Sequence, residues 1–145
     1  MKTIAVAFDF SNGASNALNY AKNMAKIMNQ KLVIVHSYSP PILDPNVPVG
    51  LVEETFRDSV KILEEKLEQE VNSAKKDGLE AEYKLAFSDL GSILNDINKS
   101  EALSFVVVGK TGQQGFLDTL IGSTASHLID NLESPLLVLP ENYDS

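Results

Sequence analysis

The amino-acid sequence predicts an α/β fold, an open five-stranded parallel sheet with helices on both faces. Short apolar runs, typical of strands buried on both sides, alternate with longer segments whose apolar residues recur at helical spacing. This alternation indicates parallel strands joined by right-handed helical crossovers. The expected strand order is 3-2-1-4-5, which places the first and fourth strands side by side where the order reverses. Ligands of such sheets bind beyond the carboxyl ends of the strands at that point.

The first elements follow from local patterns. Residues 3–8 form a short apolar run and are expected to be the first strand. Ser11-Asn12-Gly13 supplies turn and capping chemistry for a helix. Lys31–Ser37 is a second buried strand, and residues 39–50, with four prolines, are expected to be a long loop. The apolar positions of the first helix are Ala14, Ala17, Leu18, Ala21, Met24, Ala25 and Met28.

A long amphipathic helix is predicted over residues 53–76, and Asp77-Gly78 ends it. Its apolar stripe consists of Phe56, Val60, Leu63, Leu67, Val71 and Ala74. The remaining elements are a strand nearer the sheet edge at 79–87, a short helix capped by Ser88-Asp89 that carries Ile93, Leu94 and Ile97, a strand at 105–108, a helix at 123–132 and a closing strand at 135–139.

Composition excludes several classes of function. The chain has 145 residues, of which 43% are apolar and 22% charged, and we expect one domain over 1–145. A net charge of −8 argues against nucleic acid and anionic membranes as partners. The absence of cysteine excludes disulfides, thiolate zinc sites and a cysteine nucleophile. No segment approaches about 18 consecutive apolar residues and no signal peptide is evident, so a cytoplasmic protein is expected.

Residues 109–124 are the most informative segment. They directly follow the predicted fourth strand and end where a helical pattern begins. Glycines allow a backbone to approach a phosphate, and the first amides of a helix bind anions. A Walker A motif would need a glycine where Ser104 stands, and a dinucleotide fingerprint would need its glycines after the first strand, so neither motif fits.

The spacing Gly109-x2-Gly112-x9-Gly122-Ser123 resembles the nucleotide-binding motif of the universal stress protein family. The resemblance covers the whole chain, since the Asp-x-Ser end of the first strand at Asp9 and the second and closing strands also match. It implies the adenine nucleotide alpha hydrolase-like fold and a protein that binds ATP. Mg²⁺ can accompany the nucleotide, because phosphates supply its oxygen ligands.

The resemblance also implies roles for individual residues. Gly109, Gly112 and Gly122 would wrap the ribose and phosphates, with Lys110 beside them. Ser123 would meet phosphate oxygens, with Thr124 close by. Asp9 and Ser37 would lie near the adenine, with Ser11 in the same Asp-x-Ser end, although the family residue at position 37 is usually apolar.

Other interpretations of these residues stay open. The glycines can serve backbone geometry alone, Ser123 and Asp9 can be helix caps, and Lys110 can be a solvated side chain. His36, at the end of a buried strand, is expected to be a hydrogen-bonded structural residue. No histidine and acid have the spacing of metal ligands, so no metal held by the protein itself is expected.

Three functions fit this sequence. The favoured one is an ATP-binding regulatory or stress-response protein, because few acidic groups are expected near the phosphates and catalysis of phosphoryl transfer needs them. A slow ATPase of the same fold and a nucleotide-free homodimeric interaction module are the alternatives. The resemblance implies a homodimer formed through the last strand, Leu136 to Leu139.

Overall fold

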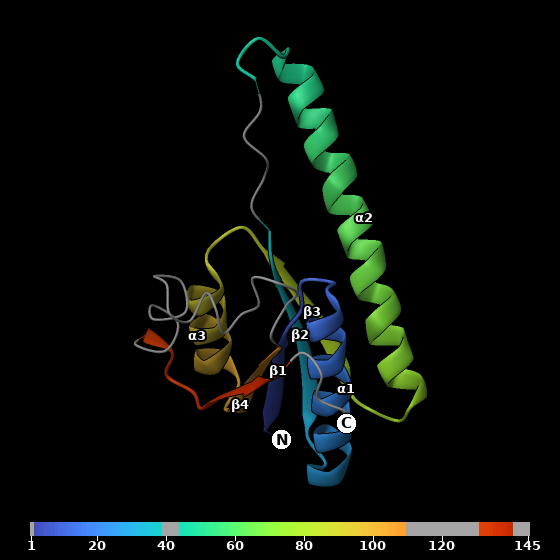
Figure 1. The fold of residues 1–145 in the computed structure, drawn as a ribbon, viewed down its shortest axis with the longest axis vertical. Coiled ribbons are helices and arrows are strands. Elements are labelled where there is room, and N and C mark those ends of the chain that lie inside the picture. Colours follow the sequence, from blue (N-terminus) through green and yellow to red (C-terminus); the bar gives the residue numbers. More distant parts are fainter. Residues whose placement is uncertain (1, 39–43, 110–130, 141–145) are drawn as a thin grey trace.

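The computed structural model describes residues 2–38, 44–109 and 131–140. Five parallel strands form one sheet, flanked by helices on both faces (Figure 1). In chain order the elements are β1 (Thr3–Ala7), α1 (Asn12–Met28), β2 (Lys31–Ser37), α2 (Val49–Lys76), β3 (Ala81–Ala86), α3 (Leu90–Ser100), β4 (Leu103–Gly109) and β5 (Leu136–Leu139).

The strand order is β3-β2-β1-β4-β5, as the sequence predicts. β1 pairs with β2 on one side and with β4 on the other. The chain adds β2 and β3 on one side of β1 and then crosses over to add β4 and β5 on the other side, so the strand order reverses at β1. The carboxyl ends of β1, β2 and β4 therefore lie together at one edge of the sheet. This edge is where a ligand of a doubly wound sheet is expected.

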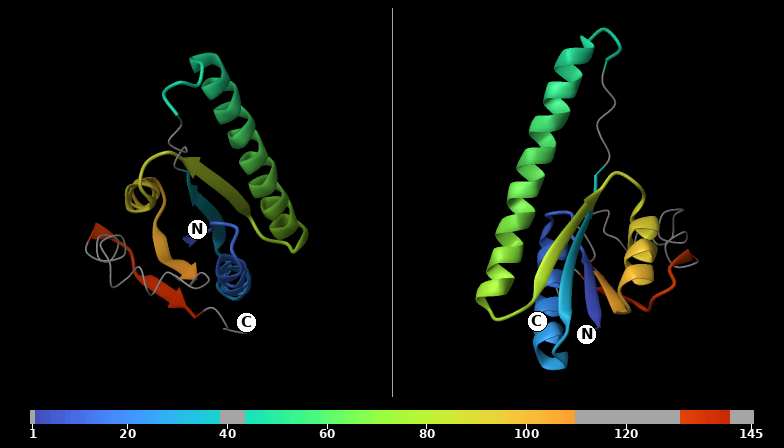
Figure 2. Two further views of the ribbon diagram at one scale, coloured as in Figure 1. Left: turned by 45° about the horizontal axis from the view of Figure 1, so that its top comes forward. Right: turned by 180° about the vertical axis from the view of Figure 1, so that it is seen from behind.

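The two faces of the sheet bury different side chains, because successive residues of a strand point to opposite sides. On one face, Ile4, Val6 and Ile34 pack with the apolar residues of α1 and α2. On the other, Ala5, Val33 and Val106 pack with α3. The two further views in Figure 2 show α1 and α2 on one side of the sheet and α3 on the other. Burial on both faces explains why these strands are continuous apolar runs.

Helix α2 begins earlier than the sequence predicts. It starts at Val49 rather than at residue 53, so the last two residues of the predicted loop are helical. Pro48 precedes the helix with φ −57°, and its carbonyl accepts the amides of Leu51 and Val52, which starts the first turn. The loop prediction was wrong for positions 49 and 50, because Gly50 lies in the first turn of the helix and not at its boundary with the loop.

Only the C-terminal part of α2 packs on the sheet. Leu67, Val71 and Ala74 are buried, whereas Phe56, Val60 and Leu63 of the same predicted stripe are half-buried. Figure 1 shows why: the N-terminal half of the helix projects beyond the edge of the sheet. The apolar face of α2 predicted from the sequence is correct, but the apolar stripe extends beyond the part of the sheet on which the helix packs.

The remaining differences concern element ends. β4 starts at Leu103, two residues before the prediction, because Thr3 of β1 pairs with it. β1, β3 and β5 are each shorter than predicted by one to three residues. The helix predicted at 123–132 falls almost wholly outside the described residues. None of the described helices combines the length and the apolar character that a membrane span requires.

Candidate functional site at the carboxyl edge of the sheet

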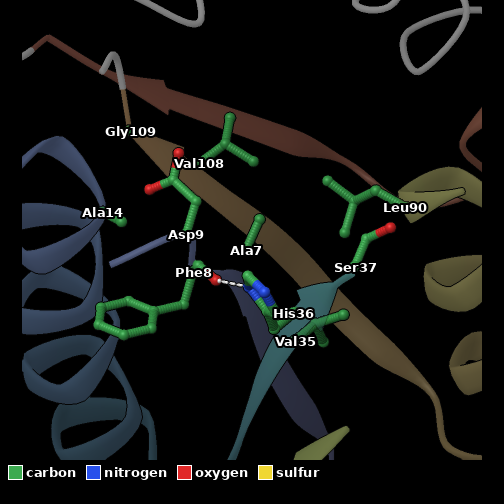
Figure 3. Close-up of a pocket in the computed structure, with 10 residues that line it drawn as sticks. All are labelled: Ala7, Phe8, Asp9, Ala14, Val35, His36, Ser37, Leu90, Val108 and Gly109. Carbon is green, nitrogen blue, oxygen red and sulfur yellow. Dashed lines mark hydrogen bonds between the residues drawn. The ribbon is translucent and has the colours of Figure 1, made fainter. Parts of the chain in front are cut away.

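A cavity of about 270 Å³ lies where the carboxyl ends of β1, β2 and β4 meet (Figure 3). Its walls come from these three strands, from the first turn of α1 and from the first residue of α3. Most of the lining is apolar or backbone, and Asp9, His36 and Ser37 contribute the polar side chains. The lining residues are Ala7, Phe8, Asp9, Ala14, Val35, His36, Ser37, Leu90, Val108 and Gly109.

Asp9 is held in place by the turn that follows β1. Its Oδ1 accepts hydrogen bonds from the Ser11 amide at 3.1 Å and the Ser11 hydroxyl at 2.5 Å. The Ser11 hydroxyl oxygen in turn accepts from the Ala14 amide at 3.1 Å and so caps α1. The cap of α1 is therefore Ser11 rather than Asp9, and Asp9 orients the capping residue. This carboxylate stands at the cavity wall in a fixed orientation (Figure 3).

The end of β2 supplies two polar side chains to the same wall. His36 Nδ1 lies 2.7 Å from the Phe8 carbonyl oxygen and donates to it, which ties the ends of β1 and β2 together (Figure 3). The Ser37 hydroxyl donates to the carbonyl oxygen of Ser88 at 2.7 Å. The structure thus shows the structural hydrogen bond expected for His36. It also shows the hydroxyl of Ser37 bonded to the turn that follows β3.

Gly109, the last residue of β4, lies against the first turn of α1. A Cβ placed there would lie 2.1 Å from the carbonyl oxygen of Gly13 and 2.5 Å from its carbonyl carbon. Both are backbone atoms, so neither contact can be relieved by a side-chain rotation. Gly109 is therefore required by the close approach of β4 and α1, whether or not a ligand binds.

The structure brings three of the predicted site residues, Asp9, Ser37 and Gly109, into one cavity. Ser11 does not line the cavity but holds Asp9. The other predicted residues, Lys110, Gly112, Gly122, Ser123 and Thr124, lie outside the described residues.

Sequence reasoning missed Leu90 and Ala14 as lining residues. Each stands at the start of a helix that follows a strand, Leu90 after the cap Asp89 and Ala14 after the cap Ser11. Such positions lie at the carboxyl edge of a parallel sheet, so the caps themselves were a usable signal. Within the described ranges, no three acidic or histidine side chains are grouped so that they would hold a metal ion.

Solved structures of similar fold include proteins with bound nucleotides. The universal stress protein UspA of Lactobacillus plantarum has a TM-score of 0.74 with 16% identity, covering 94% of this chain and 96% of that chain. A universal stress protein of Archaeoglobus fulgidus in complex with dAMP has a TM-score of 0.65 with 20% identity, covering 95% and 97%. A family protein of Arabidopsis thaliana with AMP bound has a TM-score of 0.64 with 18% identity, covering 100% and 95%.

Proteins of similar sequence are also universal stress proteins. The universal stress protein YxiE of Bacillus subtilis is 27% identical over 146 residues, which cover 92% of this chain and 95% of that protein. Universal stress protein Sll1388 of Synechocystis is 22% identical over 147 residues, covering 94% and 96%. The model of the Universal stress protein family matches residues 1–140. With a match over nearly its whole length, the chain belongs to the universal stress protein family.

Proposed function

We propose that this protein binds an adenine nucleotide, with ATP as its ligand, and acts as a regulatory stress-response protein rather than as an efficient enzyme. The observation that carries the proposal is the cavity at the carboxyl edge of β1, β2 and β4, lined largely by apolar groups with Asp9 at its wall. Apolar walls with a few oriented polar groups are typical of nucleoside pockets. Relatives of similar fold were solved with dAMP and with AMP.

The described part of the cavity suits the base and sugar of the nucleotide. Its volume of about 270 Å³ lies near the lower end of ligand pockets. Asp9 is a carboxylate and would repel phosphate, but it can accept hydrogen bonds from the amine of adenine or from ribose hydroxyls. We therefore assign this cavity, with Asp9 and Ser37 in its lining, to the nucleoside.

The phosphates belong to the glycine loop in this proposal. Gly112, Gly122, Ser123 and Thr124, with Lys110, would surround them through backbone amides, hydroxyls and one ammonium group. Gly109 joins the two parts, because it lines the cavity and also begins the loop. Mg²⁺, if carried, would be held chiefly by phosphate oxygens, since Asp9 is the one carboxylate among the described lining residues.

The lining of the cavity favours a protein that binds nucleotide over an efficient phosphotransferase. Phosphoryl transfer needs charge neutralisation together with a group that positions the attacking water or hydroxyl. Asp9 already accepts two hydrogen bonds from Ser11 and lines the cavity assigned to the nucleoside. Phosphate release from added ATP should therefore be slow, measured over hours, and many turnovers per minute would contradict this part of the proposal.

The proposal predicts that purified protein, once denatured, releases adenine nucleotide, and that protein freed of nucleotide gives a heat of binding with ATP. Replacing Gly122 with valine should weaken ATP binding by more than about tenfold, because a side chain there would exclude the phosphates. Calorimetric titration measures both effects. If neither nucleotide in the extract nor heat on titration is found, the protein is not an ATP binder.

Gly50→Val is the matched control for this experiment. Gly50 lies in the first turn of α2, and a Cβ there would have no neighbour within 4 Å. The same change of residue at this open position should leave ATP affinity unchanged. Loss of affinity in both variants would trace the effect to general destabilisation rather than to the loop.

We also propose that the protein forms a homodimer through β5. The two edge strands of the described sheet differ in character. β3 carries the charged residues Glu82 and Lys84, which discourage pairing, whereas β5 consists of four apolar residues, Leu136–Leu139. An apolar edge with free backbone groups pairs readily with a second copy of itself.

Light scattering should report twice the monomer mass at micromolar concentrations. Val138→Lys, which puts a charge on β5, should shift the protein to the monomer, whereas Lys84→Glu on β3 should not. A monomeric wild type, or a dimer insensitive to the β5 change, would exclude this interface.

A further inference from the structure

Phe10 has a backbone conformation that its side chain does not favour. Its φ is +67°, in the left-handed region, where a residue with a Cβ is strained. Among the described non-glycine residues, Asn29 is the other with positive φ, and it ends α1 in the way that asparagine commonly does. Phenylalanine has no such local advantage. Strain of this kind persists where the surrounding structure imposes it, most often near functional sites.

Contacts from the end of the first strand, from β2 and from α2 fix the ring of Phe10. It packs edge-on against Phe8, with ring centroids 4.9 Å apart, and against His36, with centroids 5.1 Å apart. The ammonium group of Lys66, on α2, lies 5.5 Å from the ring centroid, in a cation–π contact. The ring is half-buried and belongs to the core on the side of α1 and α2. These contacts offset the strain of the left-handed backbone.

Phe10 itself does not line the cavity, but three residues around it, Phe8, Asp9 and His36, do. Asp9 directly precedes it, and His36 packs against its ring. The turn at Phe10 allows Ser11 to bond back to Asp9 while the phenyl ring packs against the core. His36, steadied by the ring, donates to the Phe8 carbonyl at 2.7 Å. The ring therefore contacts His36 directly, and it reaches Asp9 only through the turn that it anchors in the core.

We propose that Phe10 is a positioning residue of the nucleotide site, whose ring holds Asp9 and His36 in the orientation that receives the nucleoside. The inference rests on the proposed function, because it concerns the same cavity. Without the ring, these two side chains would have to be ordered at the moment of binding. Ordering two side chains on binding lowers affinity by about tenfold.

Two substitutions separate positioning from simple packing. Phe10→Ala removes the ring and keeps the backbone strain, whereas Phe10→Gly removes the ring and relieves the strain. Phe10→Gly should therefore be the more stable of the two in urea unfolding. If the ring positions the site, both variants bind ATP about tenfold more weakly than wild type in calorimetric titration. Phe10→Tyr, which keeps the ring, should bind within about threefold of wild type.

A second measurement needs no nucleotide. In wild type, nitrogen NMR of the His36 ring should show the tautomer with hydrogen on Nδ1, and this proton should be protected by its bond to Phe8. In Phe10→Gly the protection should be lost although the protein remains folded. Near wild-type ATP affinity in Phe10→Gly, or an unchanged His36 signal, overturns the positioning role while the proposed function stands. A wild type that binds no ATP overturns the proposed function instead, and the His36 signal then shows whether Phe10 orders this wall at all.

Discussion

At the scale of single residues, two separate requirements call for glycine at position 109. Its place at the end of β4 suits the start of a loop that approaches phosphate, but its contact with the Gly13 backbone demands glycine for the fold alone. Loss of nucleotide binding in a Gly109 variant would therefore not identify the phosphate loop. Gly122, which we propose to lie at the phosphates, is the better probe of binding, and Gly109 is the better probe of how β4 packs on α1.

Gly109→Ala should destabilise the protein by about 1–3 kcal/mol, the usual cost of forcing an extra carbon into a packed region. The new Cβ cannot be accommodated unless β4 and α1 move apart, because it meets backbone atoms. Urea unfolding measures the loss. Gly50→Ala, in an open position of α2, should leave the free energy of unfolding unchanged or raise it slightly. Equal stability of the two variants would show that β4 and α1 adjust without cost.

Sequence reasoning reached some of these residues and not others. Asp9 could be placed at the site because it follows a recognisable strand at the switch point, and Ser37 was placed there by the family resemblance. The contact between Gly109 and Gly13 could not be predicted, since it depends on how closely a strand and a helix pack. The left-handed conformation of Phe10 has no sequence signal either, because no glycine or asparagine marks it.

At the scale of elements, α2 divides into an anchored part and a projecting part. Leu67 is fully buried against the sheet, whereas Leu51, near the start of the same helix, is 52% exposed. Between them, Phe56 is in contact with Tyr38 and Phe87, with ring centroids 6.0 Å and 5.3 Å away. This aromatic cluster links α2 to the ends of β2 and β3.

Leu67→Ala and Leu51→Ala should differ sharply in stability. Emptying a buried leucine site costs about 2–5 kcal/mol, whereas removing an exposed leucine costs less than about 0.5 kcal/mol. Urea unfolding of the two variants, which carry the same chemical change on the same helix, measures the contrast. A comparable loss in both would mean that the projecting half is buried in solution.

The helix also shows what a hydrophobic pattern can and cannot predict. The stripe from Phe56 to Ala74 gives the correct face of α2, because apolar spacing reports helix phase. It does not report where the opposing surface ends. The early start at Val49 was missed for a related reason: Gly50 and Pro48 are typical of loops, and no apolar partner marks the first turn.

At the scale of the whole molecule, Lys31 joins segments that are distant in sequence at the edge opposite the cavity. Its ammonium nitrogen lies 2.6 Å from Glu101 Oε1 and 3.0 Å from Glu82 Oε1. Burial lowers the pKa of Lys31, but the hydrogen bonds and charges of Glu101 and Glu82 outweigh burial and raise this pKa above its ordinary 10.5. Folding therefore favours the protonated form of Lys31.

Stability should consequently fall in alkaline solution. A raised pKa in the folded state contributes stability that is complete below the ordinary pKa and is lost as pH rises through the folded value. Burial, with the charges of Glu64 and Glu68, also raises the pKa of Tyr83, and the loss has the same sign because folding favours the neutral phenol. Urea unfolding at about pH 8 and above about pH 11 should show the decline.

Glu101→Gln and Tyr83→Phe separate the two contributions to this decline. Each should make the loss of stability shallower, the first by removing a partner of Lys31 and the second by removing the phenol. A decline as steep in Glu101→Gln as in wild type would exclude the Lys31–Glu101 pair as a source of the alkaline sensitivity.

The whole fold was the most predictable level of description. Apolar runs and helical spacing indicated a doubly wound parallel sheet, and the order β3-β2-β1-β4-β5, which was the favoured one among those that right-handed crossovers allow, is confirmed. Finer features depend on the distances between helices and strands, and the hydrophobic pattern of one sequence carries no information on these distances. The cavity is the clearest example, because its location follows from topology while its lining depends on packing.

The projecting half of α2 also makes the protein easy to label. The chain contains no cysteine, so Glu54→Cys would introduce a unique thiol on an exposed position of that helix. A dye coupled there would stand clear of the buried contacts at Leu67, Val71 and Ala74. Fluorescence anisotropy of such a conjugate would then follow assembly in solution without altering either the cavity or the β5 edge.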